Sequence, residues 1–106
     1  MDEYIMVLTT TDSKEVAEGI AERLVEKKLA ACVQIIGPIK SVYRWKKKVE
    51  KAEEWLCFIK TRASLFSELE RVIKQIHPYE VPEIIALPIV NGSSDYLDWL
   101  QRETES

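Results

Sequence analysis

The segment IHPYEVPEIIALP, residues 76–88, gathers several side chains that could bind an ion or transfer a proton. It contains the only histidine of the chain, His77, followed by Tyr79, Glu80 and Glu83. Imidazole and carboxylate groups serve as metal ligands and as acid–base groups, so one hypothesis is a metal or catalytic site. The other hypothesis is structural, because Pro78 disfavours helical geometry at His77 and ends a helix there. The structural interpretation is favoured, and both hypotheses stay open at this point.

The two cysteines, Cys32 and Cys57, lie 25 positions apart without a CxxC spacing. That spacing argues against a disulfide framework or a closed zinc site. Both stand in apolar runs, where cysteine is usually a small buried hydrophobe. The sequence does not place either thiol beside His77, and the chain has no HExxH, Walker or GxGxxG motif. We therefore expect no enzyme activity.

The composition predicts one globular domain over residues 1–106. Hydrophobic residues make up 46% of the chain and charged residues 31%, as in an ordinary folded domain. A net charge of −3 gives no general attraction to phosphate backbones or anionic lipid, so no nucleic-acid partner is expected. The first ten residues carry acids where a secretory signal carries bases, and their apolar run is too short to span a bilayer. We expect a cytoplasmic protein without membrane insertion.

Hydrophobic periodicity divides the first half of the chain into strands and one helix. Residues 4–10 form a continuous apolar run typical of a central strand. A helix follows up to about Lys28, with Asp12 as the expected N-cap. Residues 29–36 begin a second strand, which Gly37 and its following proline are expected to bend and which continues with alternating faces over residues 39–45.

The second strand is expected to turn at Lys46–Lys48 and to return as a third strand over residues 49–61. Each arm of this hairpin exceeds the usual strand length, so one end should project beyond a small core. We interpret the lysines at the tip as solvent-exposed charges that discourage aggregation through the strand edges, rather than as an anion-binding site. The side chains of Val42, Tyr43 and Trp45 lie on this hairpin, so we expect another surface to cover them.

The sequence of the second half of the chain predicts a helix, a fourth strand and a final helix. Ser64 is the expected N-cap of the second helix, which should stop at the HPY corner. Residues 81–90 are predicted as a fourth strand, and the proline near each end fits an edge or a bulge because it removes a ladder donor. Ser94 is the expected N-cap of a final helix that points Tyr96, Leu97 and Leu100 inward.

The order βαββαβ plus a C-terminal helix predicts the α+β class, as a ferredoxin-like sandwich of four antiparallel strands and two helices. An RNA-recognition module is not supported, since the third strand WLCFIKT lacks the RNP1 glycines. An acylphosphatase-like phosphate loop is not supported either, since TTTDSKE contains neither glycine nor arginine. The fold alone does not decide the function.

Five stretches resemble one known family, the CutA divalent-cation tolerance proteins. They follow in order along nearly the whole chain: EKKLAAC (26–32), VYRWKKKVE (42–50), FIKTR (58–62), IHPYEVPEIIALPI (76–89) and SDYLDWL (94–100). The resemblance implies a cytoplasmic homotrimer, similar in architecture to the PII signalling proteins, with a role in tolerance of copper and other divalent cations. In such a trimer Val42, Tyr43 and Trp45 would pack against neighbouring subunits. The short turn at the hairpin tip lacks the long PII loop, so nucleotide sensing is not carried over.

The resemblance also implies metal ligands, and this chain departs from them. In copper-binding members a cysteine near the end of the first strand and two successive histidines are the candidate ligands, and here those positions hold Thr9, Ile76 and His77. Thiolate and imidazole match copper, whereas a hydroxyl and an alkyl chain do not. A copper or other divalent-cation site would therefore rest on His77, assisted by Glu80 or Cys32 from the same or another subunit.

Two functions remain in competition, and both are compatible with the family. One is a metal-handling protein that binds copper or another divalent cation. The other is a trimeric sensor or scaffold that binds a small molecule or a protein partner in clefts between subunits and has no direct metal role. The residues expected to line such a cleft are Trp45, Lys60, Tyr79 and Glu83, with His77 and Glu80.

Overall fold

A computed structural model describes residues 3–105 of the chain. The elements in order are β1 (Tyr4–Thr11), α1 (Lys14–Glu26), β2 (Cys32–Trp45), β3 (Lys48–Arg62), a 3₁₀ turn (Ala63–Leu65), α2 (Phe66–Ile76), β4 (Ile84–Pro88) and α3 (Ser94–Glu103). This order confirms the predicted βαββαβ arrangement with an additional C-terminal helix. Within the described range no helix is long and apolar enough to cross a membrane.

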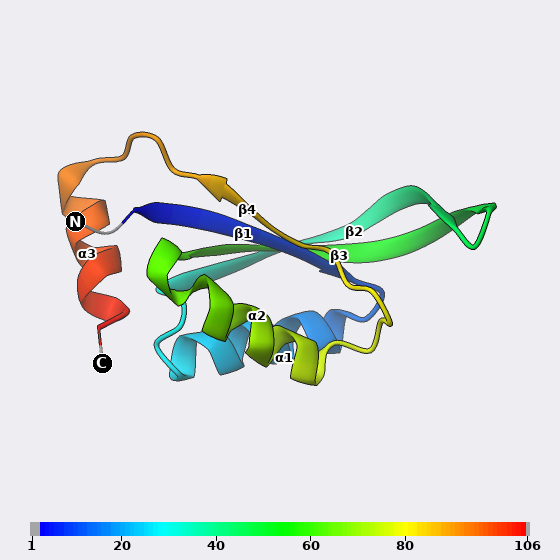
Figure 1. Ribbon diagram of the computed structural model, residues 1–106, viewed down its shortest axis with the longest axis horizontal. Helices are drawn as coiled ribbons and strands as arrows, with labels where there is room; N and C mark the ends of the chain where they lie inside the picture. Colours follow the sequence, from blue (N-terminus) through cyan, green and yellow to red (C-terminus); the bar gives the residue numbers. More distant parts are fainter. Residues whose placement is uncertain (1–2, 106) are drawn as a thin grey trace.

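The four strands form one antiparallel sheet in the order β2-β3-β1-β4. Figure 1 shows α1 and α2 against one face of this sheet and α3 at its end, near the start of β1. The predicted α+β sandwich is confirmed. β4 lies at the edge of the sheet, which is one of the two positions that its prolines allowed, because proline cannot donate to a second neighbour.

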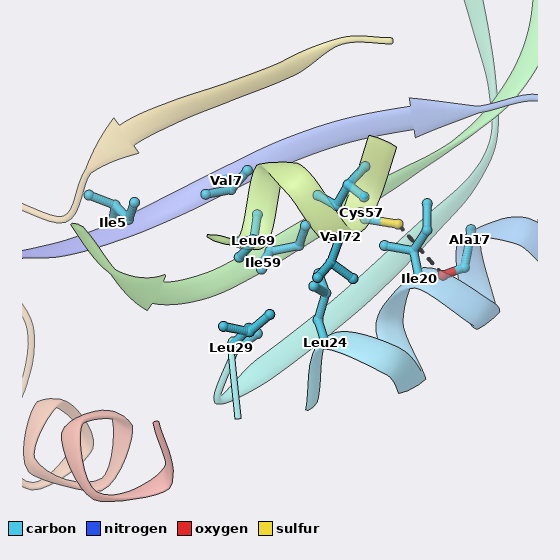
Figure 2. Close-up of a cluster of buried hydrophobic side chains, with 12 residues drawn as sticks. Ile5, Val7, Ala17, Ile20, Leu24, Leu29, Cys57, Ile59, Leu69 and Val72 are labelled. Carbon is cyan, nitrogen blue, oxygen red and sulfur yellow. Dashed lines mark hydrogen bonds between the residues drawn. The ribbon is translucent and has the colours of Figure 1, made fainter. Parts of the chain in front are cut away.

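The core lies between the sheet and the two helices. Ile20 and Leu24 of α1 and Leu69 and Ile73 of α2 are fully buried against alternate residues of β1 and β3. Figure 2 shows Ile20, Leu24 and Leu69 in this layer. Burying one such side chain contributes about 1.5–3 kcal/mol. Cys57 belongs to the same cluster, and its thiol lies 3.9 Å from the carbonyl oxygen of Ala17.

The opposite face of the sheet is also apolar but is only partly covered. Met6 pairs with Leu87 and Leu8 with Ile85, so these four side chains share that face. Leu87 is 41% exposed and Ile85 49%. The same face continues onto the hairpin, where Ile36 is also exposed. A single copy of the chain therefore leaves a broad apolar sheet surface in contact with solvent.

The hairpin of β2 and β3 projects past the helices and gives the molecule a length of 44 Å against 25 and 22 Å in the other directions (Figure 1). The pairing register shifts between Ile36 and Ile39, which confirms the bend predicted at Gly37. Glycine is required there, because a Cβ on Gly37 would stand 2.2 Å from Cδ1 of Trp55. The bulge thus lets an indole ring lie against the backbone where the hairpin leaves the core.

Two predicted N-caps are wrong by one residue. Ser13, and not Asp12, accepts the capping hydrogen bond of α1, and Ser93, and not Ser94, caps α3. In both places two neighbouring polar residues could cap. The one that does so has an extended backbone and reaches the N–H three residues further on.

Three further predictions are corrected. A 3₁₀ turn at Ala63–Leu65 precedes α2, so the residue at the N-cap position of α2 is Leu65 and not Ser64. β4 is shorter than the predicted range of residues 81–90, because the residues before Ile84 belong to the loop that joins α2 to β4. Tyr96 does not point inward, since 41% of it is exposed.

Candidate functional site

His77 stands at the corner where α2 ends. Its backbone is extended, as expected before Pro78, and its N–H donates to the carbonyl of Ile73 at 2.8 Å. The imidazole is buried, with Nε2 2.7 Å from the carbonyl oxygen of Thr10 and Nδ1 3.2 Å from the backbone nitrogen of Tyr79. Nδ1 must accept from that amide, so Nε2 carries the hydrogen and donates to Thr10. The ring ties the loop after α2 to the end of β1.

Tyr79 and Glu54 form the polar contact between this loop and β3. The Tyr79 hydroxyl donates to Oε2 of Glu54 at 2.7 Å, and Glu54 is only 5% exposed. The Tyr79 ring meets the His77 ring edge-on, with centroids 4.7 Å apart. Burial, followed by the hydrogen bond to Glu54 and its negative charge, raises the pKa of the Tyr79 phenol far above its ordinary value of 10.0. The phenol therefore remains a hydrogen-bond donor to Glu54 at neutral pH.

A groove of about 770 Å³ opens between the hairpin and the loop that joins α2 to β4. The hairpin supplies residues of β2 and the buried Glu54 of β3, and the loop supplies the facing wall. Three carboxylates and one guanidinium line it, together with aromatic rings from both sides. Its lining includes Tyr43, Arg44, Trp45, Tyr79, Glu80 and Glu83.

Most residues of the predicted cleft line this groove. Trp45, Tyr79, Glu80 and Glu83 do so, while Lys60 does not. Lys60 lies six residues along β3 from Glu54, about 20 Å away at strand spacing, and its ammonium group hydrogen-bonds the side chain of Gln34. His77 is buried behind Tyr79 and positions the loop rather than lining the groove.

The residues predicted as metal ligands lie apart in one chain. Cys32 is half-buried at the start of β2, Glu80 is exposed in the groove, and both ring nitrogens of His77 already have partners. At the positions where copper-binding relatives were expected to have ligands, Thr9 is fully buried and Ile76 is half-buried at the end of α2. Within residues 3–105 no three histidine, cysteine or acidic side chains gather around a point that could hold a metal. A site using Cys32, Glu80 and His77 together would need a second copy of the chain.

The sequence between residues 5 and 103 matches the family model described as CutA1 divalent ion tolerance protein. The chain belongs to this family. The family is named for cation tolerance and not for a reaction. The fold, the HPYEVPE corner and the long hairpin all fall inside the matched region.

Individual relatives show how much of the chain is shared. The divalent-cation tolerance protein CutA of Thermus thermophilus is 48% identical over 99 residues, which cover 93% of this chain and 96% of that protein. Protein CutA of Mus musculus is 47% identical over 97 residues, 92% of this chain but only 55% of that protein. The chain therefore spans nearly all of one curated relative and about half of another.

Solved structures of the family superpose closely on this chain. The Thermus thermophilus divalent cation tolerance protein (Cut A1) gives a TM-score of 0.94 at 47% identity, covering 96% of this chain and 99% of that one. A periplasmic divalent cation tolerance protein CutA from Archaeoglobus fulgidus gives 0.93 at 44% identity, covering 96% and 99%. This family member therefore keeps the fold of its relatives over almost its full length.

Sequence reasoning did not identify Glu54 as a groove residue. The chain has 18 acidic residues, and the run VEKAEEW offers three glutamates close together. One signal was available, because Glu54 alternates with Leu56 and Phe58 on one face of β3. A glutamate in step with apolar residues of a strand is unusual and marks a position where a carboxyl group needs a partner.

Proposed function

We propose that the chain is a homotrimeric divalent-cation tolerance protein in which the groove between hairpin and loop lies at a subunit boundary and binds a small ligand. The observation that supports this most is the groove itself, a 770 Å³ space that joins aromatic walls to a buried carboxyl group. Ligand sites of this size commonly combine an apolar lining with a few fixed polar groups. Binding, and not catalysis, is then the way in which the protein affects cation tolerance.

The trimer is supported by the surfaces that one copy leaves uncovered. Val42 is 59% exposed, and Tyr43 and Trp45 are exposed beside it on a hairpin that extends beyond the core. An exposed edge strand and a wide apolar sheet face are the features that natural proteins cover by association. Light scattering should give three times the mass of the chain, and Val42→Glu should lower it. A wild-type mass of one chain would refute the trimer.

Complementation tests the role of the groove. In a strain deleted for its own CutA1 protein and challenged with copper, the wild-type chain should restore growth and Glu54→Gln should not. Glu53→Gln is the matched control, because Glu53 is exposed on the same strand and does not line the groove. Full rescue by a folded, trimeric Glu54→Gln protein would contradict the proposal. We place the protein in the cytoplasm, which fractionation of the same strain tests.

Direct metal handling is the second candidate, supported by the name of the family. Copper or another divalent cation would bind at His77, Glu80 and Cys32 contributed by neighbouring copies, using imidazole, carboxylate and thiolate donors. His77 would have to release one of its present hydrogen bonds to do so. Calorimetric titration of the metal-stripped protein with copper and zinc should then show saturable binding that His77→Gln abolishes. Binding unchanged in that variant would remove His77 from the metal site.

A further inference from the structure

Positive charge is concentrated on the outer half of the hairpin. Residues 40–51 contain six lysine or arginine side chains and one glutamate, a net charge of +5, while the rest of the chain carries −8. Within residues 3–105 none of these six basic side chains forms an ion pair with an acidic one. One end of an acidic protein is therefore positive and attracts anions.

Three of these lysines stand at the turn. β2 ends at Trp45 and β3 begins at Lys48, and the two residues between them are Lys46 and Lys47. All three lysines are exposed, and Figure 1 shows the turn at the end of the hairpin that lies farthest from the helices. Protection of strand edges explains a lysine on a strand but not Lys46 and Lys47, since a turn has no edge to protect. Their charge therefore needs another explanation.

The backbone of this turn favours residues other than lysine. Lys46 and Lys47 have φ angles of 50° and 70°, as in a type I′ turn. Asparagine and glycine adopt these angles most readily, because a Cβ is strained in the left-handed region. Neighbouring ammonium groups also repel each other. The turn thus keeps two lysines against its backbone preference, and strain of this kind is found most often at functional positions.

The side chains at the tip fit a chain of phosphates better than a single phosphate group. Lysine is a flexible point charge and lacks the planar fork with which arginine binds one phosphate at two atoms. Three neighbouring ammonium groups match a row of negative charges, which releases its counterions when it is neutralised. A nucleic-acid strand also needs rings on which its bases stack. The ring nearest the turn, Trp45, already has the Nζ of Lys46 5.7 Å from its centroid and is assigned above to the subunit contact.

We infer that Lys46, Lys47 and Lys48 bind a chain of phosphate groups, of which inorganic polyphosphate is the simplest example. Phosphate oxygens are also ligands for divalent cations, so such a chain would bring these cations to a member of the divalent ion tolerance family. None of the three lysines lines the groove between hairpin and loop. The inference therefore stands or falls independently of the groove as a ligand site.

Calorimetric titration of the intact protein with sodium polyphosphate tests the inference. The logarithm of the wild-type affinity should fall linearly with the logarithm of the salt concentration. The variant Lys46→Gln/Lys47→Gln/Lys48→Gln should bind at least tenfold more weakly. Its salt slope should be smaller by about 2, because each phosphate that is no longer neutralised removes about 0.7.

A matched control removes the same charge elsewhere. Lys14→Gln/Lys27→Gln/Lys28→Gln changes three exposed lysines in or beside α1 and should bind polyphosphate like the wild type. An equal loss of affinity in this control would refute the tip as the binding site, because only the net charge would then matter.

A second variant gives the turn the residues that its angles favour. Lys46→Asn/Lys47→Gly should unfold at a higher urea concentration than the wild type and should bind polyphosphate more weakly. A stabilised variant with wild-type affinity would refute the role of the two lysines.

The remaining outcomes identify the anion. No binding of polyphosphate by the wild type, or equal competition by orthophosphate at the same phosphate concentration, would refute the phosphate chain. Tighter binding to phosphatidylserine vesicles or to a single-stranded oligonucleotide would overturn it in favour of a lipid surface or a nucleic acid. If the triple variant at the tip lost the wild-type mass in light scattering, the lysines would be holding a neighbouring copy and the inference would be wrong. The salt dependence of wild-type binding needs no substitution, so the test does not depend on the folding of a variant.

Discussion

Replacing Thr9 by valine should stabilise this protein. Thr9 is fully buried in β1, opposite Cys57 of β3 on the core face of the sheet, and its hydroxyl oxygen has no hydrogen-bond partner in the part of the chain that the structure describes. Burying an unpaired hydroxyl costs roughly 1–3 kcal/mol. Valine has nearly the same shape and no such group, so Thr9→Val should raise the free energy of unfolding by about 1 kcal/mol.

Thr61 offers a matched control on the neighbouring strand. It is equally buried, but its hydroxyl donates to the carbonyl oxygen of Leu29 at 2.6 Å. Thr61→Val loses that bond and leaves the carbonyl short of a donor, so it should lower the free energy of unfolding by about 1–2 kcal/mol. The same chemical change is therefore expected to have opposite signs at two fully buried positions.

Urea unfolding measured by tryptophan fluorescence can separate the two variants. The free-energy difference between them should be about 2–3 kcal/mol, with an unchanged dependence on denaturant. All samples need the same chain concentration, because association changes apparent stability. If Thr9→Val destabilised the protein as much as Thr61→Val, the Thr9 hydroxyl would have to be bonded and the reasoning would be refuted.

Three further predictions follow from particular residues. Lys28 has a left-handed backbone (φ 60°) after α1, so Lys28→Gly should raise the free energy of unfolding in urea by about 0.5–1 kcal/mol. Lys27 has an ordinary backbone (φ −82°), so Lys27→Gly should not stabilise the protein. Equal effects of the two substitutions would contradict this prediction. Tyr79→Phe removes the donor to buried Glu54 and should lower the free energy of unfolding by about 1.5–3 kcal/mol. Tyr43→Phe should change it little, because the Tyr43 hydroxyl makes no hydrogen bond within residues 3–105. An unchanged Tyr79→Phe protein would refute the role of that bond. Burial raises the pKa of the Cys57 thiol from 9.0 to about 11, so a thiol reagent at pH 8 should leave Cys57 unmodified until the chain unfolds, and rapid native modification of both cysteines would contradict its burial. Because the folded-state pKa is the higher one, the contribution of this thiol to stability is complete below pH 9 and is lost as the pH rises through 11.

The fold could be predicted from the sequence because local and long-range patterns agree. Alternation along residues 39–45 and the Gly37 bend together specify a long, kinked hairpin, and the structure has both. The errors occur where two neighbours compete for one role. Asp12 and Ser13 are both good caps, and only the backbone angles decide between them.

The candidate site was harder to predict, because its parts are distant in the sequence. The loop residues Tyr79 and Glu80 form one cluster in the chain, but Glu54 lies 25 positions before Tyr79 and looks like its acidic neighbours. Lys60 was expected in the same cleft, yet lies about 20 Å from Glu54 in one chain. Residue type alone does not show which of many carboxylates is buried.

The geometry gives His77 a positioning role that connects the structural and functional hypotheses. Its ring holds the loop to the end of β1, which fixes Tyr79 at hydrogen-bonding distance from Glu54. On the hairpin side, Gly37 lets the strand bend where the Trp55 ring lies against its backbone. Both walls are thus anchored by contacts outside the groove, and a site held in this way loses little conformational freedom when a ligand binds. A histidine that positions a loop explains why the HPYEVPE corner can matter for function without any of its imidazole atoms contacting the ligand.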